Sequence, residues 1–169
     1  LAAAGGRLEP FAPDDADFAA WSLEADVMVD AIFGIGLSRP VEGDALIAVH
    51  MMNTCPVPVV SADIPSGVET DTGRVLGAAV EADATVTFTL PKAGHYVGRG
   101  ALCTGKLTVA DIGIPADLAQ GLDCPVRAVE ARDVILPRRK RDAHKGDFGK
   151  VYILGGSVGY SGAPVLAAR

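Results

Sequence analysis

Long hydrophobic runs are missing from this chain of 169 residues. A membrane-spanning helix needs about 18 or more consecutive apolar residues, and no segment approaches that length. The opening segment, residues 1–6, has neither a basic leader nor a long apolar stretch, so it does not resemble a signal peptide. The sequence therefore predicts a protein that neither enters a membrane nor is exported, and the expected location is cytoplasmic.

Cysteine is scarce as well. Cys55, Cys103 and Cys124 are an odd number and lack the spacing of metal ligands, which argues against a disulfide framework and against a zinc site. We interpret all three as buried or incidental thiols.

Positive charge is scarce over most of the chain. Residues 1–131 hold 7 Lys or Arg against 18 Asp or Glu, whereas residues 132–169 hold 8 against 3. Since an acidic surface repels nucleic acid, we expect no such partner. The basic run 138–141 is interpreted as a solvated linker in preference to a targeting signal or an anionic-surface patch.

What the sequence does contain is enough apolar material for one buried core, because 49% of its residues are hydrophobic. The chain begins at Leu1 without Met, in a segment typical of a helix end, and stops at Arg169 within an Ala-rich, helix-like segment. We therefore expect a fragment cut at both ends.

The apolar residues recur in the periods of an α/β fold. Helices are predicted at 14–25 and 44–52, and strands at 27–33, 57–64, 84–90 and 106–112. A strand, a helix and a second strand form a parallel crossover, and the later strands, rich in Val, Thr and Leu, extend the same sheet. The predicted fold class is α/β with a mainly parallel sheet.

The composition then changes towards the C-terminus. Residues 115–122 are predicted as a short helix at best, 126–134 as a final short strand or the entry to a linker, 151–154 as a strand, 155–159 as a Gly-rich turn and 161–169 as a helix. We accordingly expect one domain over 1–131, a basic linker over 132–143 and the start of a second domain over 144–169.

Two aspartates stand where predicted strands end. Asp30 precedes the loop Gly34-Ile35-Gly36, in which missing Cβ atoms let backbone N–H groups approach a phosphate-bearing ligand. Asp63 follows an uncharged run, and partial burial there would raise the pKa of its carboxyl and suit it to acid–base work. The alternative for both is turn or helix capping.

Further polar residues are candidates for a site where the predicted strands end. Asp30 and Ser66 offer hard oxygen ligands that suit an alkali or alkaline-earth cation. Lys92 follows the third strand and could hold a phosphate, or could be a surface lysine that ends the strand. His50 and His95 have no recognisable partner in the sequence, and we interpret both as structural.

Three separated motifs, VDAIFGIGLSRPVEG, DIPSGVETDTGRVLGAAVEADATVTFTLPKAG and GKLTVADIGIP, closely resemble the NAD(P)H-hydrate epimerase domain of bifunctional nicotinamide-nucleotide repair enzymes. The resemblance covers roughly Asp26–Pro115. The segment HKGDFGKVYILGGS, residues 144–157, resembles the start of the ADP- or ATP-dependent dehydratase domain of the same enzymes.

The resemblance implies a Rossmann-like three-layer sandwich followed by the opening of a ribokinase-like domain. It also implies an isomerase that interconverts the R and S forms of hydrated NADH or NADPH at C6, coupled in the full-length chain to a lyase that uses ADP or ATP. Asp30 and Ser66 would bind one potassium ion, and Asp63 would bind substrate and transfer the proton, with Lys92 a second catalytic candidate. The implied substrate-binding residues are Gly34, Ile35, Gly36, Leu37, Ser38, Arg39, Pro40, Asp63 and Ala163.

Two departures limit what this piece does alone. The family's N-terminal helix and its loop Gly-Asn-Asn-Gly-Gly-Asp-Gly would precede Leu1, and the dehydratase segment ends before its nucleotide-binding and catalytic parts. We therefore expect the piece by itself to be inactive. A non-catalytic nucleotide-binding module remains an alternative function, whereas a Rossmann oxidoreductase is disfavoured because no G-x-G-x-x-G opens a helix after the first strand. A homo-oligomer is left open.

Overall fold

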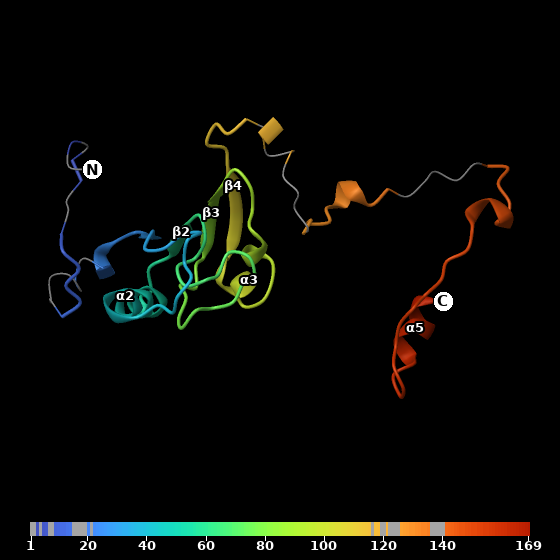
Figure 1. The fold of residues 1–169 in the computed structure, drawn as a ribbon, viewed down its shortest axis with the longest axis horizontal. Coiled ribbons are helices and arrows are strands. Elements are labelled where there is room, and N and C mark those ends of the chain that lie inside the picture. The colour runs from blue at the N-terminus through green and yellow to red at the C-terminus, as the bar shows by residue number, and fades with distance from the viewer. Residues whose placement is uncertain are drawn as a thin grey trace. The chain divides into compact units, whose positions relative to one another are not determined.

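The computed structural model describes residues 3, 5–6, 9–14, 20, 22–115, 117–118, 121, 126–135 and 141–169. The chain divides into two units, Leu1–Val126 and Arg127–Arg169 (Figure 1). Most of the regular structure lies in the first unit. Among the described residues, no helix is long and apolar enough to cross a membrane.

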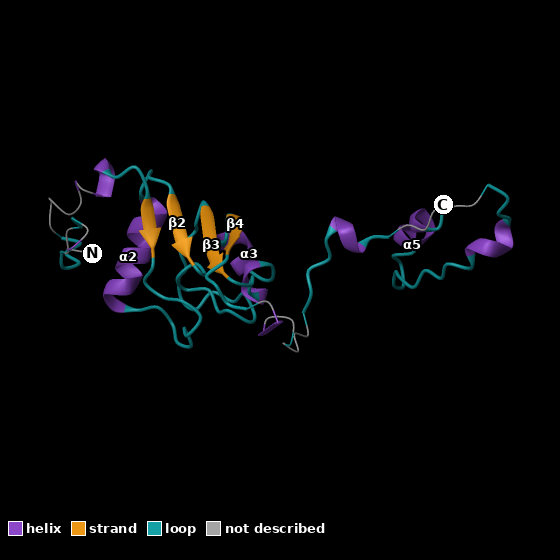
Figure 2. Ribbon diagram, turned by 90° about the horizontal axis from the view of Figure 1, so that it is seen from above, coloured by secondary structure: helices purple, strands orange, loops and turns teal. Residues whose placement is uncertain are grey.

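Four parallel strands form the centre of the first unit. They are β1 (Met28–Asp30), β2 (Val59–Ala62), β3 (Ala84–Phe88) and β4 (Lys106–Ala110), in that order across the sheet. Figure 2 shows the four strands side by side. The pairing register sets Asp30 opposite Ser61 and Ser61 opposite Thr85. The predicted α/β fold class with a parallel sheet is confirmed.

The connections between strands decide how the sheet is covered. Helix α2 (Gly43–Thr54) links β1 to β2 and runs slightly beyond the predicted range of 44–52. The β3–β4 connection contains only η2 (Ala93–His95) and α3 (Gly100–Cys103). This agrees with the absence of a long helical period between those strands in the sequence.

The core lies on one face of the sheet. Its first cluster brings Val49 of α2 against Val59 of β2, together with Val41, Val80 and Ala82. A second cluster joins Ile64, Val68, Ala79 and Cys103. Each fully buried Val or Ile contributes about 1.5–3 kcal/mol relative to an exposed side chain, so these clusters hold the loop after β2 against the sheet.

The opposite face is more open in the part of the chain that the structure describes. Val29 and Phe88, which share it, are 61% and 39% exposed, and Val60 and Val86 are half-buried. Parallel sheets are usually covered on both faces. The third layer of the expected sandwich is therefore not among the described residues and remains a prediction.

Several predictions for the C-terminal part differ from the structure. Residues 126–134, predicted as a final short strand or the entry to a linker, contain the short turn η3 (Ala131–Asp133) and no strand, so only the first alternative is wrong. Residues 151–154 are irregular and exposed, so the strand predicted there is wrong. A parallel strand needs a hydrogen-bonded neighbour, and no described strand pairs with this segment. The predicted helix at 161–169 is present as α5 (Gly162–Ala167), after the turn η4 (Lys145–Phe148).

Some predictions fall partly or wholly outside the described residues. These are half of the helix at 14–25, half of the short helix at 115–122, Cys124 and the basic residues 138–140. Of the remaining thiols, Cys103 is buried and Cys55 is half-buried, and both are free.

The loop after β2 depends on glycine at position 67. Gly67 has φ of +98°, and a Cβ built there would lie 1.9 Å from the Ala78 carbonyl oxygen. We expect Gly67→Ala to destabilise the protein by more than about 1 kcal/mol, because strain and collision add. The midpoint of urea unfolding should fall, and hydrogen exchange should accelerate at the amides of Leu76 and Val80, which donate to Gly67 and Ser66.

Gly34→Ala is the matched control, because a Cβ at Gly34 meets no atom within 4 Å and its φ is not positive. An unfolding midpoint for Gly67→Ala equal to that of Gly34→Ala would contradict the prediction.

Candidate functional site

Polar residues gather where the parallel strands end. Asp30 is the last residue of β1, Asp63 directly follows β2, and Thr87 lies near the end of β3. Ligands of open α/β sheets bind beyond the carboxyl ends of the strands, where neighbouring loops converge. This edge is therefore the candidate site.

Asp30 is completely buried, with 0% exposure, and both of its carboxylate oxygens are occupied. Ser61 Oγ and the Ser66 N–H each donate to Oδ2 at 2.8 Å, while Ser66 Oγ donates to Oδ1 at 2.5 Å and the Ile32 N–H to the same atom at 3.4 Å. Because β1 and β2 are neighbours, one carboxylate ties the end of β1 to the loop after β2.

The Ser66 hydroxyl extends this cluster into the loop after β1. It accepts the Phe33 N–H at 2.8 Å and lies 3.3 Å from the Phe33 carbonyl oxygen. The Asp30 carboxylate, the Ser66 hydroxyl and this carbonyl are hard oxygen donors, the kind that an alkali cation takes. Within the described residues no ion pair involves Asp30. A buried carboxylate without a cationic side chain suits a bound cation.

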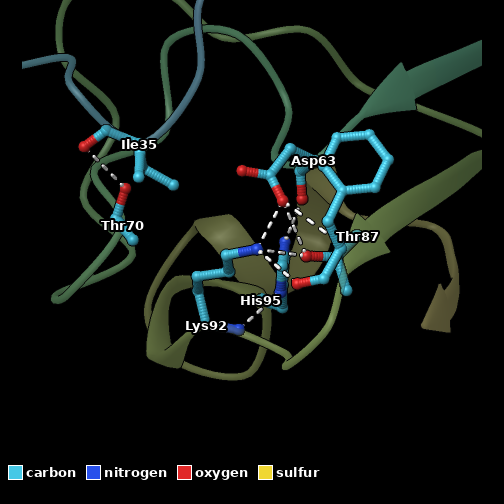
Figure 3. A network of polar contacts seen from close by, with 7 residues as sticks. Ile35, Asp63, Thr70, Thr87, Lys92 and His95 are labelled. Carbon is cyan, nitrogen blue, oxygen red and sulfur yellow. Dashed lines mark hydrogen bonds and ion pairs between the residues drawn. The ribbon is translucent and has the colours of Figure 1, made fainter. Parts of the chain in front are cut away.

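Asp63 stands in the second polar cluster, shown in Figure 3. Its φ is +68°, which is unusual for a residue other than glycine. Oδ1 forms an ion pair with Lys92 Nζ and also accepts Thr87 Oγ1 at 3.0 Å and the Phe88 N–H at 3.2 Å. In the described part of the chain, no residue donates to Oδ2. One carboxylate oxygen is thus fixed and the other is open.

Lys92 is held in turn by β3. Its Nζ donates to Thr87 Oγ1 at 2.7 Å and to the Phe88 carbonyl at 3.3 Å. Thr87 is fully buried, and it can accept from Lys92 while donating to Asp63. The ammonium and the carboxylate therefore share one buried hydroxyl.

The pKa of Asp63 corrects a sequence-based expectation. Burial raises the pKa of this carboxyl, but the hydrogen bonds from Lys92, from the Phe88 N–H and from Thr87 together lower it by more. The net pKa lies below its ordinary value of 3.8. The predicted increase in the pKa of Asp63 is wrong, because the prediction rested on burial at the strand end and did not include the contact between Lys92 and the carboxylate. At neutral pH Asp63 is therefore ionised, the form in which a carboxylate can accept a proton.

His95 belongs to the same cluster, although the sequence indicated no partner for it. It is 3% exposed; its Nε2 lies 2.9 Å from the Asp63 carbonyl oxygen, and its Nδ1 accepts the Lys92 N–H at 3.0 Å. The only available signal was its position three residues after Lys92. His50 is exposed on α2.

The predicted substrate loop borders an open cavity of about 300 Å³, lined by Ile32, Phe33, Gly34, Gly36, Leu37, Ser38 and Arg39. A Cβ at Gly34 or Gly36 would meet no protein atom within 4 Å, so these glycines leave room beside the cavity. The Ile35 carbonyl accepts Thr70 Oγ1 at 3.4 Å, which joins this loop to the loop after β2 (Figure 3).

The two aspartates end adjacent strands but stand in separate hydrogen-bonded clusters, joined by the short segment from Asp63 to Ser66. Neither lines the cavity of the substrate loop. Ala163 is on α5 in the second unit. The assigned roles of all these residues remain predictions.

Comparison with known proteins identifies the family of this chain. A family model described as "YjeF-related protein N-terminus" matches residues 1–94. The bifunctional NAD(P)H-hydrate repair enzyme Nnr of Thermofilum pendens is 48% identical over 144 residues, and that of Moorella thermoacetica 45% over 148. An NAD(P)H-hydrate epimerase of Limosilactobacillus fermentum is 49% identical over 88 residues, or 52% of this chain and 42% of the relative.

The bifunctional relatives are much longer than this chain. The matches cover 85% and 86% of the chain but only 27% and 28% of the two relatives. The crystal structure of yeast ynu0 matches with a TM-score of 0.52 and 24% identity, over 73% of this chain and 51% of that one. This likeness supports the fold.

The low pKa of Asp63 leads to a prediction for Lys92. Lys92→Met removes a hydrogen bond and a positive charge from the Asp63 carboxylate, so the pKa of Asp63 should rise. A carbon-13 NMR titration of the Asp63 carboxyl measures this shift. Lys106→Met, on the exposed start of β4, is the control and should leave that pKa unchanged. Equal titration curves for Lys92→Met and wild type would contradict the assignment.

Proposed function

Because the chain belongs to the family of YjeF-related protein N-termini, we propose that the protein containing it interconverts the R and S forms of hydrated NADH and NADPH at C6. The observation that carries the proposal is that three donors hold Oδ1 of Asp63, while no described residue donates to Oδ2. Relatives named as NAD(P)H-hydrate epimerase and as bifunctional repair enzymes support the same reaction.

Asp63 is assigned the proton transfer. Inversion at C6 requires one bond of this hemiaminal carbon to break and to re-form on its other face. When the C6 hydroxyl gives up its proton, the C6–N1 bond breaks, N1 takes the electron pair and C6 becomes a planar carbonyl. N1 then attacks the other face of C6 and the proton returns to the oxygen. Asp63 is ionised and offers Oδ2 to that proton. Lys92 compensates the negative charge and holds Oδ1, so the carboxylate keeps its orientation through both transfers.

The loop Gly34–Pro40 is assigned to substrate binding. Its cavity, its two glycines without steric neighbours and the guanidinium of Arg39 suit a ligand that carries phosphate and ribose. The bond between Ser66 and Phe33 holds the start of this loop next to the segment that carries Asp63.

Asp30 and Ser66 are assigned to one potassium ion, with the Phe33 carbonyl as a further oxygen donor. When bound, the cation supplies positive charge that offsets the buried carboxylate and attracts the anionic groups of the substrate. Asp30 itself holds Ser61 and Ser66 in place.

We also propose that the chain includes the start of a dehydratase. A match that covers 85% of 169 residues cannot be contained in residues 1–131, so likeness to the bifunctional relatives extends into the C-terminal part. The proposed organisation is an epimerase domain to residue 131, a linker over 132–143 and a dehydratase from residue 144. ADP or ATP is the proposed co-substrate of the dehydratase, and Ala163 contacts substrate there.

The acidic first part of the chain supports a small-molecule substrate without a nucleic-acid partner. We propose that the reaction takes place in the cytoplasm. A homo-oligomer is compatible with this assignment.

The assignment of Asp63 predicts the behaviour of Asp63→Asn in the full-length protein. We expect the rate at which R-form NADPH hydrate becomes the S form to fall by at least about 100-fold, because general acid–base catalysis contributes that much. The two forms can be followed by NMR in the presence of potassium. Asp26→Asn is the matched control, because Asp26 is exposed and precedes β1 at the opposite edge of the sheet; it should keep the wild-type rate.

Unchanged turnover in Asp63→Asn would remove Asp63 from the mechanism. Wild-type protein that binds NADPH hydrate but converts none of it would reject the epimerase and favour a non-catalytic nucleotide-binding module.

The potassium assignment predicts a specific salt dependence. The epimerisation rate of the full-length protein should rise with KCl and stay low when choline chloride keeps the ionic strength constant. Ser66→Ala should shift half-maximal activation to a higher KCl concentration, because it removes one oxygen donor beside Asp30. Equal rates in the two salts would contradict the potassium site.

A further inference from the structure

The ring of His95 contacts both residues of the candidate catalytic pair, Asp63 and Lys92, through its two nitrogens. It ends the turn η2, in which Ala93 follows Lys92 directly. One ring nitrogen contacts the main-chain oxygen of Asp63, and the other contacts the main-chain N–H of Lys92. The two residues are 29 positions apart in the sequence, so this ring is a direct bridge between separate loops.

The bonding partners determine the tautomer of the ring. The Lys92 N–H is a donor, so Nδ1 of His95 must carry a lone pair. In neutral imidazole the proton is then on Nε2, which donates to the Asp63 carbonyl. Burial lowers the pKa of His95, the hydrogen bond to the Asp63 carbonyl raises it in part, and the charge of Lys92 lowers it again, so the net pKa lies below its ordinary value of 6.5. The neutral ring required by this bridge is therefore the one present.

Asp63 needs such support because its backbone is strained. A non-glycine residue at φ of +68° costs on the order of 1–3 kcal/mol, and it persists only where its surroundings hold it. The Asp63 N–H donates to the Val86 carbonyl at 2.8 Å, which fixes one side of the residue to β3. The His95 ring fixes the other side.

The turn that carries His95 is itself firmly packed. Gly94 donates its N–H to the Thr70 carbonyl at 2.7 Å, and a Cβ on Gly94 would lie 2.6 Å from the Glu69 carbonyl. The turn therefore rests closely on the loop after β2. Because His95 is 3% exposed, it has little surface to offer a substrate and acts through its neighbours.

We infer that His95 is a positioning residue of the candidate site, in which Nε2–H holds the strained backbone of Asp63 while Nδ1 holds the backbone of Lys92. This rests on the proposed function only where activity is the measurement. A shift of about 1 Å in a reacting group costs up to about 100-fold in rate, so the bridge affects turnover more than substrate binding.

Two substitutions separate the halves of the bridge. In His95→Gln the amide nitrogen can take the place of Nε2 and donate to Asp63. In His95→Asn the amide oxygen can take the place of Nδ1 and accept from Lys92, while the bond to Asp63 is lost. In the full-length protein we expect His95→Gln to keep most of kcat, and His95→Asn to lose up to about 100-fold in kcat with little change in KM.

Hydrogen exchange tests the same inference without activity. The amides of Asp63 and Ile64 should exchange faster in His95→Asn than in wild type or His95→Gln, whereas the Met28 amide, at the opposite edge of the sheet, should be unchanged in all three. His50→Asn, on the exposed surface of α2, is the control and should match wild type.

Wild-type kcat and wild-type exchange in His95→Asn would overturn the inference, and so would equal impairment of His95→Gln and His95→Asn. If the wild-type full-length protein lacks epimerase activity, the proposed function fails, and the exchange comparison still decides whether His95 positions Asp63.

Discussion

The hydrogen bonds of the buried Asp30 carboxylate determine how the loops are arranged at the carboxyl ends of the strands. Parallel pairing brings Asp30 beside Ser61, and the Asp30 oxygens accept hydrogen bonds from the loop after β1, from β2 and from the loop after β2. A buried carboxylate that loses its hydrogen-bond donors costs several kcal/mol. Moving the loop after β2 away from Asp30 would therefore be unfavourable. Asp63 begins that loop, and Ser66 in the same loop contacts Phe33. Asp30 therefore indirectly fixes the positions of Asp63 and of the start of the predicted substrate loop.

Asp63 shows how opposing effects set the state of a site residue. Burial alone would favour the neutral carboxyl, whereas three donors on Oδ1 favour the anion and prevail. The same donors restrict the side chain, and the backbone is held at an unfavourable φ by contacts from β3 and from His95. The strained backbone and the ionised carboxylate are thus held by overlapping sets of contacts, and among the described residues no donor contacts Oδ2 of Asp63.

The sequence predicted the strand ends better than the contacts between them. Asp30 and Asp63 were recognisable because apolar runs stop there and Gly, Ser or Pro follow, and this pattern is local. The ion pair with Lys92 spans 29 residues and the contact with His95 spans 32; no local pattern encodes such distances, so the direction of the Asp63 pKa was predicted wrongly. Residues 151–154 failed for another reason, because an apolar run becomes a strand only beside a pairing partner.

The burial of the two aspartates distinguishes their chemistry. Asp30 is 0% exposed and both of its oxygens accept hydrogen bonds from the protein. The Asp63 side chain is 16% exposed and its Oδ2 has no donor in the described part of the chain. These surroundings are compatible with the proposed division of roles, in which Asp63 exchanges the proton with a ligand and Asp30 lies beside a cation. Two carboxylates at the ends of neighbouring strands thus differ in accessibility and bonding because of their hydrogen-bond partners, although their residue type is the same.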